Sequence, residues 1–365
     1  MDPLTHTLVG LSLAETRLKH TTPLARTTMI LGANLPDVDV VAHLISLDVA
    51  LGFRRGLTHG VLAMIVLPWL LTGGILLFDR FIRRQHLPDV PPAKFDALLR
   101  LAYIAVLTHP FLDWLNTYGV RLLMPFDNRW FYGDSVFIVD PWFWLLSGTA
   151  AVLSNTKSRL STVSWILLGT ILTLVVTRAA IVPMLGKVLW CFGVSLIASL
   201  RIWGGLQHQM NRVATFALTA AVLYAVTMFA ITQLTRWSVE HWLKTRGLSP
   251  QQIMASPVPV NPFVRDVIVS SAGQYHFLRV NWLASKTIRI NGRSISRKEP
   301  DSLIEAALQA PHVQGLRVWM RLPSYQVEEL SDGYKVTIRD IRYSRNNATG
   351  IGTEIVELDR YLNIR

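Results

Sequence analysis

Two long runs without a charged residue constrain this chain more than any other feature. They are residues 61–78, VLAMIVLPWLLTGGILLF, and residues 213–234, VATFALTAAVLYAVTMFAITQL. A helix needs about 20 consecutive apolar residues to cross the hydrocarbon core of a bilayer. Only 16% of the residues are charged, whereas a soluble domain averages about 25%. The sequence therefore predicts an integral membrane protein.

Further apolar segments add to the predicted bundle. Four more candidates for membrane spans are residues 98–114, 141–156, 160–177 and 179–200, the last with a kink expected at Pro183. Two N-terminal stretches, 4–18 and 24–35, are too short to span comfortably. We expect these two to be partial spans or core helices packed among the others.

The excess of basic residues predicts the orientation of the helices. The formal net charge is +12, and the cations gather in particular connections, which contain Arg17, Lys19, Arg26, Arg80, Arg83, Arg84, Lys94, Arg100, Lys157, Arg159, Arg201 and Arg212. Connections rich in Lys and Arg stay in the cytoplasm. The intervening connections, around residues 37–59 and 118–140, then face the other side. Because the cations serve orientation, we expect no nucleic-acid partner.

The C-terminal third has a different amino-acid composition. Segments such as VRDVIVSSAGQYHFLRVNWL, KTIRINGRSI, GLRVWMRLP and YKVTIRDIRYS are rich in β-branched and aromatic residues, and Asn291-Gly292 and Asp332-Gly333 are turn signals. DSLIEAALQA, 301–310, is typical of a short helix with an acidic cap. We predict a membrane domain at 1–240, a linker at 241–262 that contains SPVPVNP, and a β-rich (α+β) extracytoplasmic domain at 263–365.

A small set of ionisable residues recurs at the ends of the apolar segments. The set is His6, Asp37, Asp39, His59, His109 and Asp113. Ionisable groups at membrane depth are costly and by default mark a functional site. The predicted topology brings all six to the same, non-cytoplasmic side. Residues without a common purpose would divide between the two faces, so the sequence predicts one pocket.

The residue types in this set favour a divalent metal. His109 and Asp113 are four residues apart and share one face of a helix, as in metal sites of helix bundles. Asp37 and Asp39 follow Pro36, where irregular backbone can aim both carboxylates inward. With no thiolate beyond the single Cys191, imidazoles and carboxylates favour zinc, with manganese or iron as rivals. Such a site would activate water for hydrolysis.

Several neighbouring residues are second-tier candidates. Arg54 or Arg55, next to His59, can bind an anionic oxygen, or serve as an interfacial anchor. Asp140, before Pro141, is expected to cap the next helix. Other polar residues near the expected ligands are Asn34, Thr58, Asn116, Tyr118 and Arg121.

The motifs, in their order, resemble a known family. DPLTHTLVG, GANLPDVD, RGLTHG, HPFLDWLNTYG and FIVDPWFW are similar to those of bacterial inner-membrane proteins described as metal-dependent hydrolases, the LexA-regulated inner-membrane protein family. PVPVNPF and RLPSYQVEELSDGYKVTIRDIRY extend the resemblance into the C-terminal part. The resemblance implies an inner-membrane protein with a metal-dependent hydrolase activity.

The spacing is also similar, more distantly, to that of zinc-dependent phospholipase C and the S1/P1 nucleases. That resemblance implies an all-α core with clustered zinc ions that cleave phosphoesters. It implies ligand roles for His6, Asp37, His59, His109 and Asp113, with Asp39 as a further ligand or a base. The chain departs from these enzymes in lacking most of the additional histidines of a trinuclear site.

The leading hypothesis is a membrane-bound, zinc-dependent hydrolase. We expect it to cleave a phosphoester bond in a lipid or lipid-linked substrate at the outer face of the inner membrane, with Asp39 and Arg55 as catalytic residues. One alternative is a non-catalytic protein in which metal fastens the helix ends and the C-terminal domain binds a partner in an envelope stress response. The other is a transporter, for which intramembrane acids and histidines are also expected.

Overall fold

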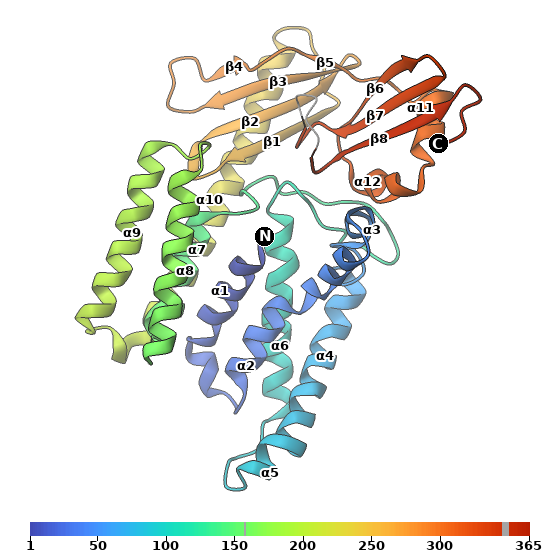
Figure 1. The fold of residues 1–365 in the computed structure, drawn as a ribbon. Helices are drawn as coiled ribbons and strands as arrows, with labels where there is room; N and C mark the ends of the chain where they lie inside the picture. Colours follow the sequence, from blue (N-terminus) through green and yellow to red (C-terminus); the bar gives the residue numbers. More distant parts are fainter. Residues whose placement is uncertain (157, 345–349) are drawn as a thin grey trace. The chain divides into compact units, whose positions relative to one another are not determined.

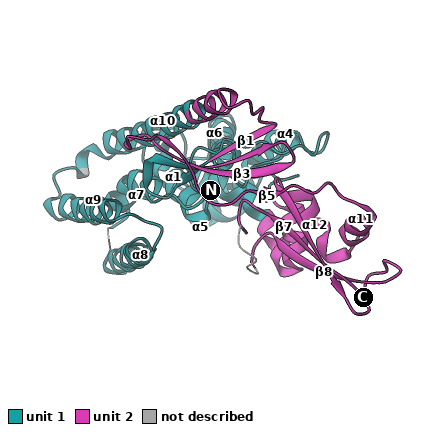
Figure 2. Cartoon of the chain, turned by 90° about the horizontal axis from the view of Figure 1, so that it is seen from above, with its two compact units in different colours: residues 1–38, 55–234, 256–265 teal, residues 39–54, 235–255, 266–365 magenta. Residues whose placement is uncertain are grey.

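The computed structural model describes residues 1–156, 158–344 and 350–365, so Lys157 of the predicted basic connections lies outside the described residues. Those residues fall into two compact units, coloured separately in Figure 2. Unit 1 comprises Met1–Val38, Arg55–Leu234 and Ser256–Arg265. Unit 2 comprises Asp39–Arg54, Thr235–Ala255 and Asp266–Arg365.

Unit 1 is built from helices, and Figure 1 labels the α-helices among them. They are α1 (Pro3–Ala14), η1 (Arg17–His20), α2 (Ala25–Asn34), α4 (Val61–Phe78), η3 (Asp79–Arg83), α5 (Arg84–His86), α6 (Phe95–Trp114), α7 (Pro141–Asn155), α8 (Arg159–Arg178), α9 (Met184–Trp203) and η4 (Gln207–Gln209). Two more helices, η2 (Leu35–Leu44) and α10 (Met210–Lys244), begin in unit 1 and end in unit 2.

The apolar segments form long helices, as the sequence predicts. Among the described residues, five helices are long and apolar enough to cross a membrane, namely Val61–His86, Phe95–Trp114, Arg159–Arg178, Met184–Trp203 and Met210–Lys244. They contain the predicted runs 61–78, 98–114, 160–177 and 213–234. The N-terminal helices α1 and α2 have 12 and 10 residues and α7 has 15, which is less than a bilayer span requires.

The prediction for residues 179–200 is wrong in one respect. Pro183 does not kink a helix, because α9 begins at Met184 and Pro183 is its N-cap. Proline has no N–H to donate and disfavours helical geometry in the residue before it. Residues 179–183 therefore connect α8 to α9 instead of belonging to a helix.

Small residues hold the core helices of unit 1 close together. A Cβ atom on Gly10 of α1 would lie 2.8 Å from the Cβ of Ala33 in α2, and one on Gly32 would lie 2.8 Å from the Cβ of Ala105 in α6. Close approach through small residues is how membrane helices associate in the absence of a hydrophobic driving force. The ends of α1, α2 and α6 are thereby brought into contact.

Unit 2 carries antiparallel sheets. Its strands are β1 (Gln252–Val258), β2 (Asn261–Ser271), β3 (Gln274–Asn281), β4 (Ile288–Ile290), β5 (Ile295–Ser296), β6 (Pro323–Leu330), β7 (Gly333–Asp340) and β8 (Thr353–Asp359), of which β1 and β2 reach into unit 1. One sheet has the order β1-β2-β3-β4, with β5 against β3, and the other has the order β6-β7-β8. In the second sheet Val336 of β7 pairs with Val327 and Val356. The predicted β-rich C-terminal region is confirmed.

One predicted strand in unit 2 is wrong. GLRVWMRLP contains the helix α12 (Gln314–Trp319), not a strand. The helix is capped by a residue that is far away in sequence, Asp48 of α3 (Leu47–Phe53). The Asp48 carboxylate accepts hydrogen bonds from the backbone N–H groups of Gly315 (2.7 Å) and Leu316 (3.2 Å). An acid at the start of a helix satisfies N–H groups that have no partner within it.

Two further predictions for this region concern a helix cap and a linker. The acidic cap is confirmed, because α11 (Ser302–Leu308) begins after Asp301, whose side chain accepts from the N–H of Ile304. The predicted linker, 241–262, contains the end of α10, β1 and the first residues of β2. The domain boundaries stay a prediction.

Candidate metal centre

The start of α1 positions His6. Asp2 is the N-cap, and its side chain accepts hydrogen bonds from the N–H and the hydroxyl of Thr5. Pro3 occupies the first turn, where its missing N–H costs nothing. The helix therefore begins at a fixed residue, and His6 lies within its first turns, 1% exposed.

A change of helix type positions Asp37. Helix α2 ends at Asn34, and the 3-10 helix η2 follows directly. Pro36 cannot donate to the carbonyl of Gly32, four residues earlier, so the α-helical pattern stops there. Burial alone would raise the pKa of Asp37, but the neighbouring His109 side chain holds that pKa below the usual range. Asp37 is therefore ionised at neutral pH.

A close backbone contact positions His59. A Cβ atom on Gly60, the N-cap of α4, would lie 2.3 Å from the carbonyl oxygen of Met124, so only glycine fits there. The N–H of Val61 also donates to the carbonyl of Leu122 at 2.8 Å. The neighbouring His59 is thus fixed by its backbone, and the Thr58 hydroxyl lies 2.9 Å from its Nδ1 atom.

The last turns of α6 supply His109 and Asp113. The Nδ1 atom of His109 lies 2.7 Å from the carbonyl oxygen of Ala33. A carbonyl accepts but cannot donate, so Nδ1 carries the proton and the lone pair is on Nε2. A histidine held in this way by a backbone carbonyl is typical of a metal ligand.

The ligand atoms of these residues converge. The Nε2 atoms of His6 and His59 lie 3.3 Å and 3.2 Å from different carboxylate oxygens of Asp113. The Nε2 atom of His109 lies 3.6 Å from Asp113 Oδ2 and 3.6 Å from Asp37 Oδ1. Two overlapping groups could each hold a metal ion: His6, His109 and Asp113, and Asp37, His59 and His109, with the chosen ligand atoms of each group all within 4.8 Å of one another.

The imidazole rings pack closely against one another. The rings of His6 and His109 stack with centroids 3.6 Å apart and an angle of 12° between their planes. Two cationic rings at that distance in a buried site would repel each other strongly. His59, His109 and Asp113 are 0% exposed.

A buried arginine completes the cluster. Nη2 of Arg55 lies 2.8 Å from Asp113 Oδ1. Nη1 donates to Asn116 Oδ1 at 3.1 Å, and the guanidinium lies 4.5 Å from the ring centre of Tyr118. Arg55 has a φ of 52°, a left-handed conformation that costs free energy for a residue with a side chain. The surrounding contacts hold this positive charge against the cluster.

The structure therefore brings together five of the six predicted ligands, together with Arg55, in unit 1. Asp39 belongs to unit 2, where its carboxylate lies 3.4 Å from the Nε atom of Arg54. Its role as a ligand or base stays a prediction. Of the second-tier residues, Asn116 and Tyr118 contact Arg55, whereas Asn34 accepts from Thr7, and Arg121 donates to Asn128. Asp140 caps α7, as predicted.

Two contacts of the cluster have no signal in the sequence. One is the carbonyl oxygen of Ala33, since every residue has a carbonyl and only the fold selects this one. The other is the α-amino group of Met1, which pairs with Asp113. The nearby Arg55 was recognisable only because it precedes His59 in the RRGLTHG motif.

The fold and this cluster define a multi-pass membrane protein with a buried group of histidines and aspartates that could hold a metal ion. The chain belongs to the YdjM inner membrane protein family, whose model matches residues 1–184, about half of the chain. All the residues of the cluster lie in the matched part. The name of the family places it in the inner membrane, in agreement with the apolar helices.

A curated relative adds a more distant similarity. The chain is 26% identical over 163 residues to the uncharacterized protein YfhP of Bacillus subtilis (strain 168), an alignment that covers 42% of this chain and 45% of the relative. The chain thus spans less than half the length of that relative. No solved structure matches the chain.

Proposed function

We propose that this protein is a metal-dependent hydrolase of the inner membrane that cleaves phosphoester bonds in a lipid or lipid-linked substrate. The observation that carries the proposal is the convergence of three imidazole Nε2 atoms on the carboxylates of Asp113 and Asp37. We also propose that the helical core is like that of phospholipase C. This part of the proposal rests on the spacing of the sequence motifs.

The donor set fits zinc better than a purely structural polar network. With metal–ligand bonds of 2.0–2.1 Å, the edge of a tetrahedron around zinc is about 3.3 Å. The contacts between ligand atoms in the cluster are 3.2–3.6 Å. Neutral imidazoles and carboxylates are ligands that zinc prefers, with manganese and iron as alternatives. A hydrogen-bonded network would instead need donors, and His109 Nε2 offers a lone pair.

The residues of the chain have distinct roles in this proposal. A divalent ion would supply Lewis acidity to water and to a phosphoryl oxygen. His6, His59, His109, Asp37 and Asp113 would hold the ion. Arg55, 2.8 Å from Asp113, keeps a positive charge where an anionic phosphoester would bind, which stabilises charge that develops in the transition state. The sequence motif adds Asp39 as a further ligand or a base.

The distribution of charge supports a site at the outer face. His6, Asp37, His59 and Asp113 lie at one set of helix ends, whereas Arg17, Lys19, Arg83 and Arg84 lie in connections at the opposite ends. Basic connections are cytoplasmic. We therefore propose that the cluster and the C-terminal domain are extracytoplasmic. A site at the interface suits a substrate whose phosphoester lies in the lipid headgroup region.

Purified protein in vesicles tests this function. We expect zinc-loaded protein to hydrolyse a phospholipid or a lipid pyrophosphate. His59→Ala should reduce the rate by at least about 100-fold, because removing a metal ligand lowers activity more than removing a residue that only orients a ligand. His86→Ala, which removes an exposed histidine, is the control and keeps the rate. Full metal occupancy without turnover on any phosphoester would contradict the proposal.

One observation favours a second function, a metal that only fastens the helix ends. His59, His109 and Asp113 are 0% exposed, and Arg55 already neutralises Asp113. In that case His59→Ala lowers metal content and thermal stability together, and no turnover exists to lose. Transport is less favoured, because the buried residues of α6 beyond His109 are apolar: Leu98, Leu101, Ala102, Ala105 and Val106.

A further inference from the structure

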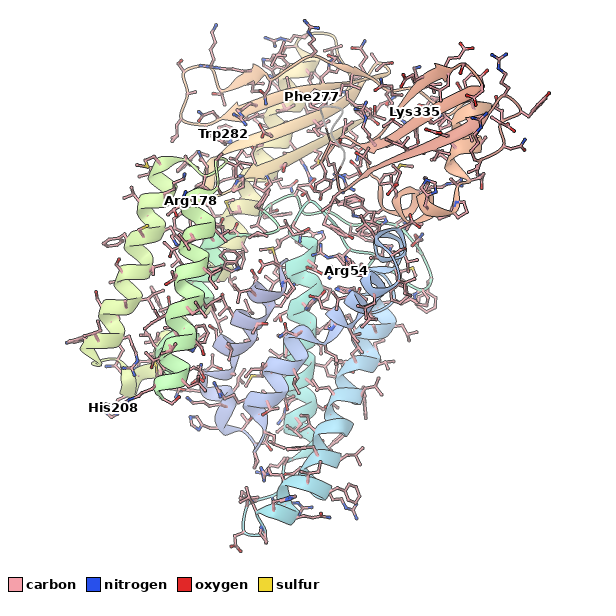
Figure 3. All side chains as sticks on the ribbon, viewed as in Figure 1. Arg54, Arg178, His208, Phe277, Trp282 and Lys335 are labelled. Atoms are coloured by element: carbon pink, nitrogen blue, oxygen red, sulfur yellow. The ribbon has the colours of Figure 1, made fainter. Side chains whose placement is uncertain are left out.

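A second feature of unit 1 is an apolar cavity between α7, α8 and α9. Its volume is about 520 Å³, within the range of about 300–1,000 Å³ typical of small-molecule sites. The walls come from Gly148 and Val152 of α7, Gly169 of α8, and Trp190 and Ile197 of α9, with Leu8 of α1. Figure 3 labels Arg178, the last residue of α8, and His208, which follows α9, at opposite ends of this region.

The few polar side chains in the walls are already satisfied. The hydroxyl of Thr170 donates to the carbonyl of Ile166, and that of Thr173 donates to the carbonyl of Gly169. Thr173 also accepts from the indole N–H of Trp190 at 3.1 Å. Because these groups are occupied, the cavity offers almost nothing to water or to a polar ligand. Its chemistry suits a hydrocarbon chain.

A cation marks one end of the cavity. Arg201, near the end of α9, lines it. Its Nε and Nη2 atoms donate to the hydroxyl and the carbonyl of Thr156, just after α7. These bonds fix the guanidinium at the end of the cavity, with Nη1 as its remaining nitrogen. A fixed arginine at the mouth of an apolar cavity is suited to bind a phosphate group.

We propose that this cavity binds an anionic phospholipid, with one acyl chain among α7, α8 and α9 and the phosphate on Arg201. The charge at the mouth selects the occupant, because Arg201 is the charged residue among those that line the cavity in the described part of the chain. The connections at this end are basic and therefore cytoplasmic. Basic pockets between membrane helices on that side bind the headgroups of anionic lipids of the inner leaflet.

This lipid site is separate from the metal centre. Helix α7 has 15 residues and rises about 22 Å at 1.5 Å per residue. Asp140 caps one end of α7, next to Asp2 and the start of α1, whereas Thr156 follows the other end. A headgroup held by Arg201 is thus at the opposite end of α7 from the cluster. The lipid is a bound ligand and not the substrate, so the inference does not depend on the proposed hydrolase.

Gly169 gives a clean way to fill the cavity. It lines the cavity, and a Cβ atom placed on it would meet no atom within 4 Å. Gly169→Leu can therefore occupy the space without a clash and without loss of helix propensity. Gly73 of α4 also has nothing within 4 Å of its added Cβ and does not line the cavity. Gly73→Leu is the matched control.

The experiment measures phospholipid bound to the full chain in mild detergent after delipidation and incubation with phosphatidylglycerol, by native mass spectrometry. We expect wild type and Gly73→Leu to retain phosphatidylglycerol at equal levels, and Gly169→Leu to lose most of it. Equal retention by Gly169→Leu and Gly73→Leu would overturn the cavity as the site.

Arg201 is tested by competition between phosphatidylglycerol and phosphatidylcholine. We expect wild type to prefer phosphatidylglycerol by about fivefold, as one basic side chain near a membrane surface provides, and Arg201→Gln to abolish the preference. Arg201→Lys keeps the charge, so it should retain part of the preference if its thermal unfolding matches wild type. An unchanged preference in Arg201→Gln would overturn the role of the cation.

Discussion

Two buried carboxylates, Asp113 in unit 1 and Asp340 in unit 2, show how the candidate metal centre differs from a structural ion pair. Asp340 accepts from the backbone N–H groups of Arg321 (2.7 Å) and Arg342 (3.0 Å) and pairs with the Arg342 guanidinium at 2.7 Å. Every one of these neighbours is a donor. The carboxylate and the guanidinium are 0% exposed, and the guanidinium lies 4.6 Å from the ring centre of Trp319.

Asp113 has the same burial but different neighbours. Beside the Arg55 guanidinium and the α-amino group of Met1, three imidazole Nε2 atoms lie within 3.2–3.6 Å of its oxygens. Neutral imidazoles bring lone pairs as well as protons, and the lone pair of His109 Nε2 faces the cluster. Burial and charge are thus common to both sites, and the lone pairs beside Asp113 separate them. The group around Asp113 could therefore hold a metal ion.

The largest effect is expected at Asp340. Asp340→Ala leaves the buried guanidinium of Arg342 without its carboxylate and should lower the free energy of unfolding by about 3–5 kcal/mol. Chemical denaturation followed by circular dichroism measures it, with and without a chelator. The exposed Asp332, paired with Arg365, is the control, and Asp332→Ala should have little effect. A loss that depends on the chelator would break the distinction between the two sites.

A smaller effect is expected where one hydroxyl orients a ligand. Thr58→Val removes the oxygen 2.9 Å from His59 Nδ1 and should weaken metal binding by about 10–100-fold, measured by competition with a chromophoric chelator. Thr108→Val is the matched control, since Thr108 precedes His109 but its hydroxyl donates to Ala105 in its own helix. Equal affinities for the two variants would show that Thr58 does not support a ligand.

An effect of similar size is expected at Asp140, a third buried acid, where burial raises the pKa to about 6. Its neighbours are the Tyr224 hydroxyl, at 2.9 Å, Asp2 and Arg265. The folded pKa of Asp140 lies above the unfolded value of 3.8. The contribution of Asp140 to the free energy of unfolding is therefore fully present below pH 4 and is lost as the pH rises to about 6. The loss is roughly 1–3 kcal/mol.

Asp140→Asn keeps the helix cap and removes this titration. Between pH 4.5 and pH 7.5, the unfolding temperature of Asp140→Asn should therefore change less than that of wild type. Asp301→Asn, which changes an exposed helix cap, is the control and should follow wild type. Parallel pH profiles for wild type and Asp140→Asn would show that Asp140 does not titrate in this range.

The sequence predicts the parts of this molecule that depend on local pattern. The run 61–78 coincides with α4, because long apolar runs form helices in a membrane whatever surrounds them. The cluster was predictable for a related reason: the predicted topology assigns the helix ends that carry the six ionisable residues to one side, and five of the six come together in the structure. Neither inference needs knowledge of tertiary contacts.

What the sequence does not predict depends on contacts between distant residues. Residues 314–319 form a helix because Asp48 caps them, and a β-like composition cannot show that. The Ala33 carbonyl orients His109 because Gly32 and Ala105 allow α2 and α6 to approach closely. The separation of Asp37 from Asp39 into different units is likewise invisible in the DVD motif.

We propose that the group around Asp113 holds a metal ion, and elemental mass spectrometry of detergent-purified protein decides whether it does. We expect stoichiometric zinc, manganese or iron in wild type and in His86→Ala, and none in His109→Ala or His109→Ala/Asp113→Ala. His109→Ala preserves the Arg55–Asp113 pair, so its fold serves as the check on the double variant. Wild-type protein without bound metal, even after supplementation, would contradict the account and leave the cluster as a polar network between helix ends.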